Sequence, residues 1–182
     1  MTIVLIHSAI IFATKAHNGQ KRKGTDLPYI IHPLEVIQIL SSVSASEDVL
    51  IAGVLHDVLE DTKITYDTLV KTFGKDIAQI VKECTASKTS TWIIQKEKTI
   101  DNLRNTSTNT AMVLCADKLS NLRSIIYDLS QESENFWNRF SERKEKVIWY
   151  YNELGIAISQ RCDLPICLKQ EYKGLLNKLN NY

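Results

Sequence analysis

Apolar residues recur with helical spacing along most of the chain, and no stretch alternates apolar and polar residues long enough to indicate a strand. The pattern predicts an all-α protein. Gly, Pro and polar clusters divide it into segments, with loops expected at residues 18–31, 85–91 and 105–110. The predicted helices cover residues 2–17, a helix opened by His32 and Pro33, and residues 46–62, 65–74, 76–84, 96–104, 111–123, 131–158 and 166–179.

The stretch 49–62 contains the most chemical information, because an almost wholly apolar run ends in His56, Asp57, Glu60 and Asp61. On one continuous helix these four side chains would fall within an arc of roughly 140°. Three carboxylates at the end of a buried helix need a counter-charge or a metal ion. The stretch therefore predicts a metal site, and the alternative is a helix end that simply emerges into solvent.

A second apolar run, residues 111–116, ends in Asp117, and Asn121 lies one helical turn further along the same face. This pair is either part of the same polar site or a capped aspartate in the core. His32 stands at the start of its predicted helix, where a lone histidine is either a capping group or a ligand.

Basic residues gather in the first loop. No Asp or Glu occurs before Asp26, so Lys15, Lys21, Arg22 and Lys23 make this part of the chain locally cationic. The cluster indicates an anionic ligand or, alternatively, a solvated basic loop. Lys88, in the loop expected at residues 85–91, is a further cation that could reach an anion.

Composition gives no global argument for nucleic acid or for a membrane, because 22 Lys and Arg against 21 Asp and Glu leave a net charge of +1. The four cysteines form no Cys-x-x-Cys pair, which favours a reduced, cytoplasmic setting. The apolar residues 3–13 are expected to form a core helix rather than a signal peptide. No Lys or Arg precedes them, and His7 and Ser8 interrupt them.

Five ordered segments together resemble the HD-domain hydrolases, and more narrowly the hydrolase domain of RelA/SpoT-type proteins and the small alarmone hydrolases. The segments are residues 16–23, 28–33, 54–62, 73–74 and 116–123. The resemblance implies one HD domain over residues 1–182. Its motif-bearing core would span about residues 13–123, with the C-terminal helices of residues 131–182 packed on it.

The resemblance also implies roles for individual residues. One divalent cation would be held between imidazoles and carboxylates, typically Mn²⁺, with Fe²⁺ or Zn²⁺ also compatible with such ligands. Two further carboxylates would position and deprotonate the attacking water, and a third group would contact a nucleotide. The implied metal ligands are His32, His56, Asp57 and Asp117. The implied residues for the attacking water are Glu60 and Asp61, and the implied nucleotide contacts are Arg22, Lys23, Tyr29, Asn121 and, more loosely, Lys88.

The activity implied by the resemblance is hydrolysis of the 3′-pyrophosphate of (p)ppGpp to GDP or GTP, the degradation of an alarmone of the stringent response. The same site could instead act on (p)ppApp or on the 2′-phosphate of NADPH, and a third alternative is a nucleotide-binding regulator with weak catalysis. Leu114 stands where many relatives have lysine, which leaves substrate preference open. The partner expected is a small nucleotide, and neither oligomeric state nor base preference follows from the sequence.

Overall fold

The computed structural model describes residues 2–85, 91–131 and 136–182. These ranges are helical and contain no strand, which confirms the predicted all-α class; a single β-bridge between Lys21 and Pro28 closes the first loop. The helices are α1 (Thr2–Ala16), α2 (Ile31–Ser42), α3 (Glu47–Leu55), α4 (Val58–Asp61), α5 (Tyr66–Phe73), α6 (Lys75–Cys84), α7 (Trp92–Asn105), α8 (Thr108–Gln131), the 3-10 helix η1 (Phe136–Arg139), α9 (Lys144–Gln160) and α10 (Ile166–Leu179).

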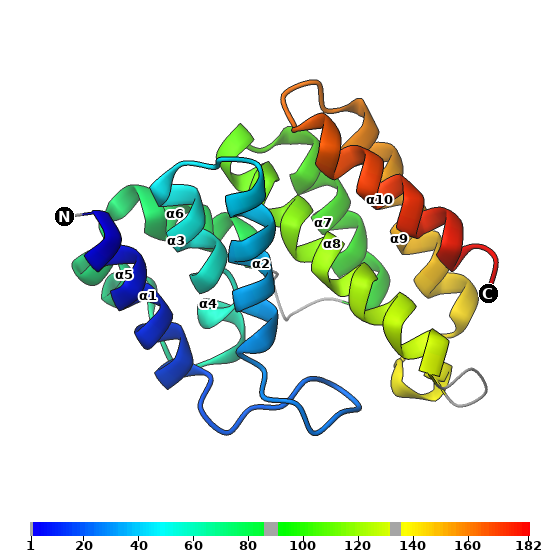
Figure 1. The fold of residues 1–182 in the computed structure, drawn as a ribbon, viewed down its shortest axis with the longest axis horizontal. Coiled ribbons are helices and arrows are strands. Elements are labelled where there is room, and N and C mark those ends of the chain that lie inside the picture. Colours follow the sequence, from blue (N-terminus) through cyan, green and yellow to red (C-terminus); the bar gives the residue numbers. More distant parts are fainter. Residues whose placement is uncertain (1, 86–90, 132–135) are drawn as a thin grey trace.

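Helices α2, α3 and α8 pack against one another in the middle of the molecule. Figure 1 shows α1, α5 and α6 on one side of this group and α9 and α10 on the other. Leucines from all three central helices are completely buried, among them Leu40, Leu55 and Leu119. Burying such side chains supplies most of the driving force for folding, at roughly 25 cal/mol per Å² of apolar surface. The central helices are therefore a rigid support for the polar residues that they carry.

The prediction of a single helix over residues 46–62 is wrong. Helix α3 ends at Leu55, a turn follows at His56 and Asp57, and the short helix α4 begins at Val58. His56 Nδ1 donates to the backbone carbonyl of Gly53 at 2.7 Å. A side-chain bond of this kind competes with the helical hydrogen-bond ladder, and it coincides with the end of α3.

The helix predicted over residues 131–158 is also wrong. Helix α8 instead continues as far as Gln131, because Ile125 and Leu129 extend its buried face. Phe136, Trp137 and Phe140 then pack on one another, with ring centroids 5.1–5.8 Å apart, in and beside η1. The backbone of Arg143 is extended, so α9 begins only at Lys144.

The polar break predicted at residues 105–110 is confined to Thr106 and Ser107, since α7 ends at Asn105 and α8 begins at Thr108. Ser107 Oγ accepts a hydrogen bond from the backbone N–H of Thr110 at 3.3 Å, which satisfies a free donor at the start of α8. Lys88 lies outside the described residues. In the described ranges, none of the helices is long and apolar enough to cross a membrane.

Candidate active site

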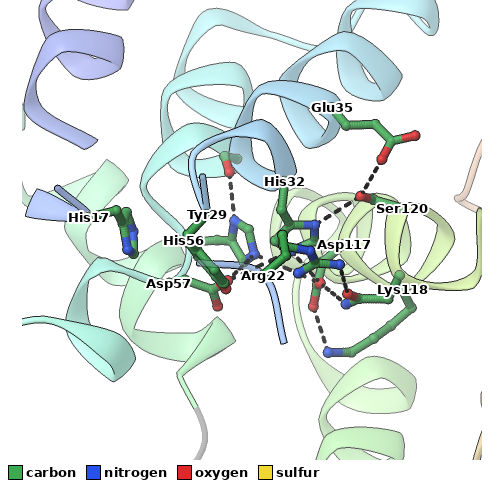
Figure 2. Close-up of polar contacts among 12 residues, drawn as sticks. His17, Arg22, Tyr29, His32, Glu35, His56, Asp57, Asp117, Lys118 and Ser120 are labelled. Atoms are coloured by element: carbon green, nitrogen blue, oxygen red, sulfur yellow. Dashed lines mark hydrogen bonds and ion pairs between the residues drawn. The ribbon is translucent and has the colours of Figure 1, made fainter. Parts of the chain in front are cut away.

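Two histidines and two aspartates meet between the central helices (Figure 2). His32 comes from the first turn of α2, His56 and Asp57 from the turn after α3, and Asp117 from the middle of α8. Asp57 Oδ2 lies 3.7 Å from His32 Nε2 and 2.9 Å from His56 Nε2. Asp117 Oδ1 lies 3.2 and 3.8 Å from the same two nitrogen atoms. The structure therefore brings together all four residues that the sequence nominated as metal ligands.

Both imidazole rings are held from their far sides. His56 Nδ1 donates to the carbonyl of Gly53, and His32 Nδ1 lies 2.9 Å from Ser120 Oγ. Since the hydroxyl of Ser120 donates to Glu35 Oε2 at 2.7 Å, it accepts from His32 Nδ1–H. Each ring therefore carries its neutral-state proton on Nδ1 and directs the Nε2 lone pair at the carboxylates. Such outer contacts orient histidines that bind metals in proteins.

His32, His56 and Asp57 offer donor atoms that all lie within 4.8 Å of one another, and Asp117 Oδ1 lies beside both imidazoles. Metal bonds of about 2.0–2.2 Å to nitrogen and oxygen place neighbouring ligand atoms about 3.0–3.6 Å apart, close to the spacing seen here. His56 Nε2 is buried and makes no hydrogen bond to any described residue. Asp57 Oδ2 lies 2.9 Å from it, as the partner of an ion pair when His56 is protonated. A bound cation could take the place of the proton between these two groups.

The charges of the cluster depend strongly on one another. Burial lowers the pKa of His32, whereas the carboxylates of Asp57 and Asp117 overcome burial at His56 and raise its pKa to about 9. Burial would raise the pKa of both aspartates, but His56 beside Asp57 and Lys118 beside Asp117 hold these pKa values well below their usual range. Two carboxylates thus stay ionised in a buried place, and a bound cation would displace the proton from His56.

Polar contacts hold each carboxylate of the cluster in position. Asp117 accepts from Lys118 Nζ at 2.5 Å and from Asn121 Nδ2 at 2.6 Å. The hydroxyl of Tyr29 donates to Asp57 Oδ2. Burial and the Asp57 charge raise the pKa of Tyr29 far above its usual value, so its hydroxyl remains a donor. Both carboxylates are therefore fixed before any ion or substrate arrives.

Glu60 and Asp61 lie on α4, beside the cluster but outside it. They line a cavity of about 520 Å³ with Gln20, Lys63 and neighbouring residues. Gln20 Nε2 donates to the backbone carbonyl of Asp61 at 2.7 Å, and His17 Nδ1 donates to Gln20 Oε1 at 2.8 Å. The Asp61 charge reaches Tyr29, since it contributes to raising the pKa of that residue. The structure thus places both carboxylates beside a cavity that is large enough to admit water.

A larger cavity of about 610 Å³ is lined in part by Tyr29 and Asn121. Arg22 reaches it from the first loop, and its Nη2 donates to Asn121 Oδ1 at 3.0 Å. Lys23 is exposed and lines the same cavity. Four of the predicted substrate-binding residues, namely Arg22, Lys23, Tyr29 and Asn121, therefore gather around one hollow.

Sequence reasoning missed several residues of the site. Ser120 and Glu35 form the contact chain behind His32, and Lys118 pairs with Asp117. Lys96 projects from α7, with its Nζ 4.8 Å from the ring centroid of Tyr150. Burial, and next the charge of Lys118, lower the pKa of Lys96 to about 8. The spacing of Ser120 three residues after Asp117 was an available signal, whereas Lys96 has no local one.

The fold and the site together define a helical hydrolase of the His-Asp type. The family model described as "HD domain" matches residues 9–146, and the chain belongs to this family. The resemblance noted in the sequence is thus confirmed.

Relatives and solved structures agree with this assignment. The chain is 40% identical, over 66% of its length and 69% of the relative's, to guanosine-3′,5′-bis(diphosphate) 3′-pyrophosphohydrolase MESH1 of Xenopus tropicalis. It is 34% identical over 97% of its length to a GTP pyrophosphokinase of Myxococcus xanthus, of which it spans 24%. A solved metazoan orthologue of SpoT, described as hydrolysing ppGpp, superposes with a TM-score of 0.81 at 27% identity, covering 96% of this chain and 94% of the other.

Proposed function

We propose that this protein removes the 3′-pyrophosphate of guanosine 3′,5′-bis(diphosphate), releasing GDP and pyrophosphate, and likewise converts the 5′-triphosphate form to GTP. The observation that supports this most is the cluster of four donor groups, in which both Nδ1 atoms bond to outer partners and both Nε2 atoms face the two carboxylates. Relatives named as hydrolases of this substrate share the fold and supply its identity.

His32, His56, Asp57 and Asp117 would hold one divalent cation, and two imidazoles with two carboxylates suit Mn²⁺, with Fe²⁺ or Zn²⁺ as other ions of that class. When bound, such a cation acidifies water and offsets charge on a phosphoryl group. Tyr29 contacts Asp57 and Lys118 contacts Asp117, and these contacts hold the two aspartates at the cluster.

Glu60 and Asp61 are proposed to position the attacking water and take its proton. The cavity beside them admits water, and the contacts of His17 and Gln20 fix the backbone at Asp61. In the reaction, water oxygen bonds to the phosphorus attached to O3′, the bond from that phosphorus to O3′ breaks, and O3′ ends protonated. A positioned carboxylate base contributes typically 10²–10⁴-fold to such a step.

Arg22, Lys23, Tyr29 and Asn121 are proposed to bind the nucleotide in the larger cavity. Arg22 meets neutral partners in Asn121 and Ser124, so its charge is available to a phosphate and its plane to a purine ring. Lys88 belongs to the same proposal as a further phosphate contact. A cytoplasmic location, and a small nucleotide rather than nucleic acid or membrane as the partner, complete the proposed function.

The test is an anion-exchange assay of the purified, Mn²⁺-loaded protein with ppGpp, ppApp or NADPH. We expect pyrophosphate release from ppGpp, none from Asp57→Ala, and a loss of about 10²–10⁴-fold in kcat for Glu60→Gln with Mn²⁺ still bound. Asp48→Ala is the matched control, because it removes an exposed carboxylate at the start of α3.

Hydrolysis of ppGpp by Asp57→Ala at the wild-type rate would refute the proposed site. Turnover confined to ppApp or NADPH would keep the site and change the substrate. Binding of all three nucleotides without turnover would instead identify a regulator.

A further inference from the structure

The far end of the larger cavity is chemically different from the end near the metal ligands. Near the ligands, Arg22 presents positive charge, since its Nη2 donates to Asn121, which in turn donates to Asp117. At the far end, Arg139 is already paired with Asp128, Nη1 to Oδ2, at 2.9 Å. Phe136 and Phe140 form the wall there, and the guanidinium of Arg139 lies 5.6 Å from the centroid of the Phe136 ring. The near end therefore suits phosphates, and the charge-balanced aromatic far end suits a neutral, flat group.

One face of α8 connects the two ends. Asp117, Asn121, Ser124 and Asp128 are spaced at i, i+4, i+7 and i+11, which keeps them within an arc of about 60° on a regular helix. At 1.5 Å per residue, Asp128 lies about 16 Å along the axis from Asp117. A nucleotide with its 3′-phosphates at Asp117 and its sugar near Asn121 would thus extend its base toward Asp128.

We infer that Asp128 recognises the base of the nucleotide and makes the site selective for guanine. Guanine carries two adjacent donors, N1–H and the 2-amino group, which match the two oxygen atoms of a carboxylate. Adenine has no N–H at position 1 and no amino group at position 2. This inference rests on the proposed function for the placement of the 3′-phosphates, and goes beyond it by assigning the base contact.

Arg139 acts as a positioning residue for Asp128. The pair is largely enclosed, with side chains 20% and 26% exposed, so the contact holds the carboxylate toward the cavity. Gly24, in the first loop, leaves the space that Arg139 occupies. A Cβ built on Gly24 would lie 2.5 Å from Arg139 Cδ, and the backbone there has a φ of +75°, which glycine adopts readily. The first loop and η1 are therefore fitted to each other across the cavity.

The experiment measures binding of GDP, ADP and IDP to the Mn²⁺-loaded protein by calorimetry, because these nucleotides lack a 3′-phosphate and need no turnover. We expect the wild type to bind GDP about ten- to a hundredfold more tightly than ADP. IDP, which lacks only the 2-amino group, should fall between them. Asp128→Asn should weaken GDP binding about tenfold, leave ADP nearly unchanged, and remove the difference between GDP and IDP.

Asp101→Asn is the matched control, since Asp101 also pairs with an arginine, Arg104, but on the exposed side of α7. It should keep the wild-type preference. Arg139→Gln should lose the preference, and Arg139→Lys, which retains a cation for Asp128, should restore part of it. A purely structural role for Arg139 would weaken GDP and ADP equally.

Equal binding of GDP and ADP by the wild type, or an unchanged ratio in folded Asp128→Asn, would overturn the inference. So would tighter binding of both nucleotides by Asp128→Asn, because that result would place phosphates at the far end. A preference for GDP in a protein that releases no pyrophosphate from ppGpp would support the inference and refute the proposed function. Pyrophosphate release without any base preference would do the reverse.

Discussion

Ser120 offers a direct test of how the metal ligands are oriented. Its hydroxyl is completely buried and lies between His32 Nδ1, at 2.9 Å, and Glu35 Oε2, at 2.7 Å. Replacing Ser120 with alanine removes the acceptor for the Nδ1 proton of His32. Glu35 would lose one donor, but it is about one-third exposed and still accepts from Arg123, so water can replace the lost contact. The damage is therefore concentrated at His32.

The magnitude follows from burial. The His32 side chain is 1% exposed, so an Nδ1–H without a partner costs about 1–3 kcal/mol. The ring can avoid this cost by moving its proton to Nε2, which faces Asp117, and that proton would then compete with a metal ion. Loss of such an outer contact typically weakens metal binding 10–100-fold. We expect Ser120→Ala to bind Mn²⁺ weaker by that factor and to unfold more easily without metal.

The assay is a titration of the metal-free protein with Mn²⁺, followed by the electron paramagnetic resonance signal of the free ion. Ser130→Ala is the control, because Ser130 lies on the same helix and its exposed hydroxyl donates to the carbonyl of Tyr127 and accepts from the side chain of Gln131, both far from the cluster in sequence. If folded Ser120→Ala binds Mn²⁺ within twofold of the wild type, the contact chain does not set the tautomer of His32, and the reasoning is refuted.

Two further predictions concern stability. The folded state lowers the pKa of Lys96 from 10.5 to about 8, so between these pH values the unfolded chain holds a proton that the folded protein has lost, and stability rises with pH. Over that pH range, the free energy of unfolding of the wild type should rise by about 3 kcal/mol relative to that of Lys96→Met, at 1.36 kcal/mol per pKa unit. Denaturant unfolding at several pH values measures this difference. A difference that does not change with pH would contradict the lowered pKa of Lys96. Gly53→Ala should lower stability by about 1–3 kcal/mol, because the new Cβ would lie 2.4 Å from Leu40 Cδ1 in the core. Gly174→Ala on α10 should instead be neutral or stabilising, because its new Cβ would meet no atom of another element within 4 Å. Equal effects of the two changes would argue against a clash with Leu40 as the cause of the loss at Gly53.

The cluster of His32, His56, Asp57 and Asp117 could be predicted because its signal is local. Asp57 and Asp117 each follow a run of apolar residues, and a charged group at the end of a buried helix needs a partner. The helix boundaries around them were harder. The break at His56 depends on a hydrogen bond to Gly53, and helical periodicity does not reveal such a bond. As a result, the arc of four side chains expected on one helix is replaced by one pair in the turn, His56 and Asp57, and a second pair on α4, Glu60 and Asp61.

Contacts between distant segments could not be predicted from the sequence. Asp128 and Arg139 face each other because α8 runs on to Gln131 and η1 turns the chain back. The apolar pattern of residues 131–158 is equally compatible with one long helix and with η1 followed by α9. Only the packing of Phe136 with its aromatic neighbours distinguishes these two arrangements. Prediction of the cavity's far end therefore required the tertiary structure.

Leu114, a leucine where the family resemblance leads us to expect lysine, can now be judged by its surroundings. Leu114 is 2% exposed and belongs to the hydrophobic core, so a lysine there would have to bury its stem and extend its charge. Lys118 already supplies a cation to Asp117, at 2.5 Å. Lys96 adds a second, because the charges of Asp117 and Glu60 both act to raise its pKa against burial. An orienting charge is therefore present at Asp117 without a lysine at position 114. The substitution removes no contact that the described cluster depends on.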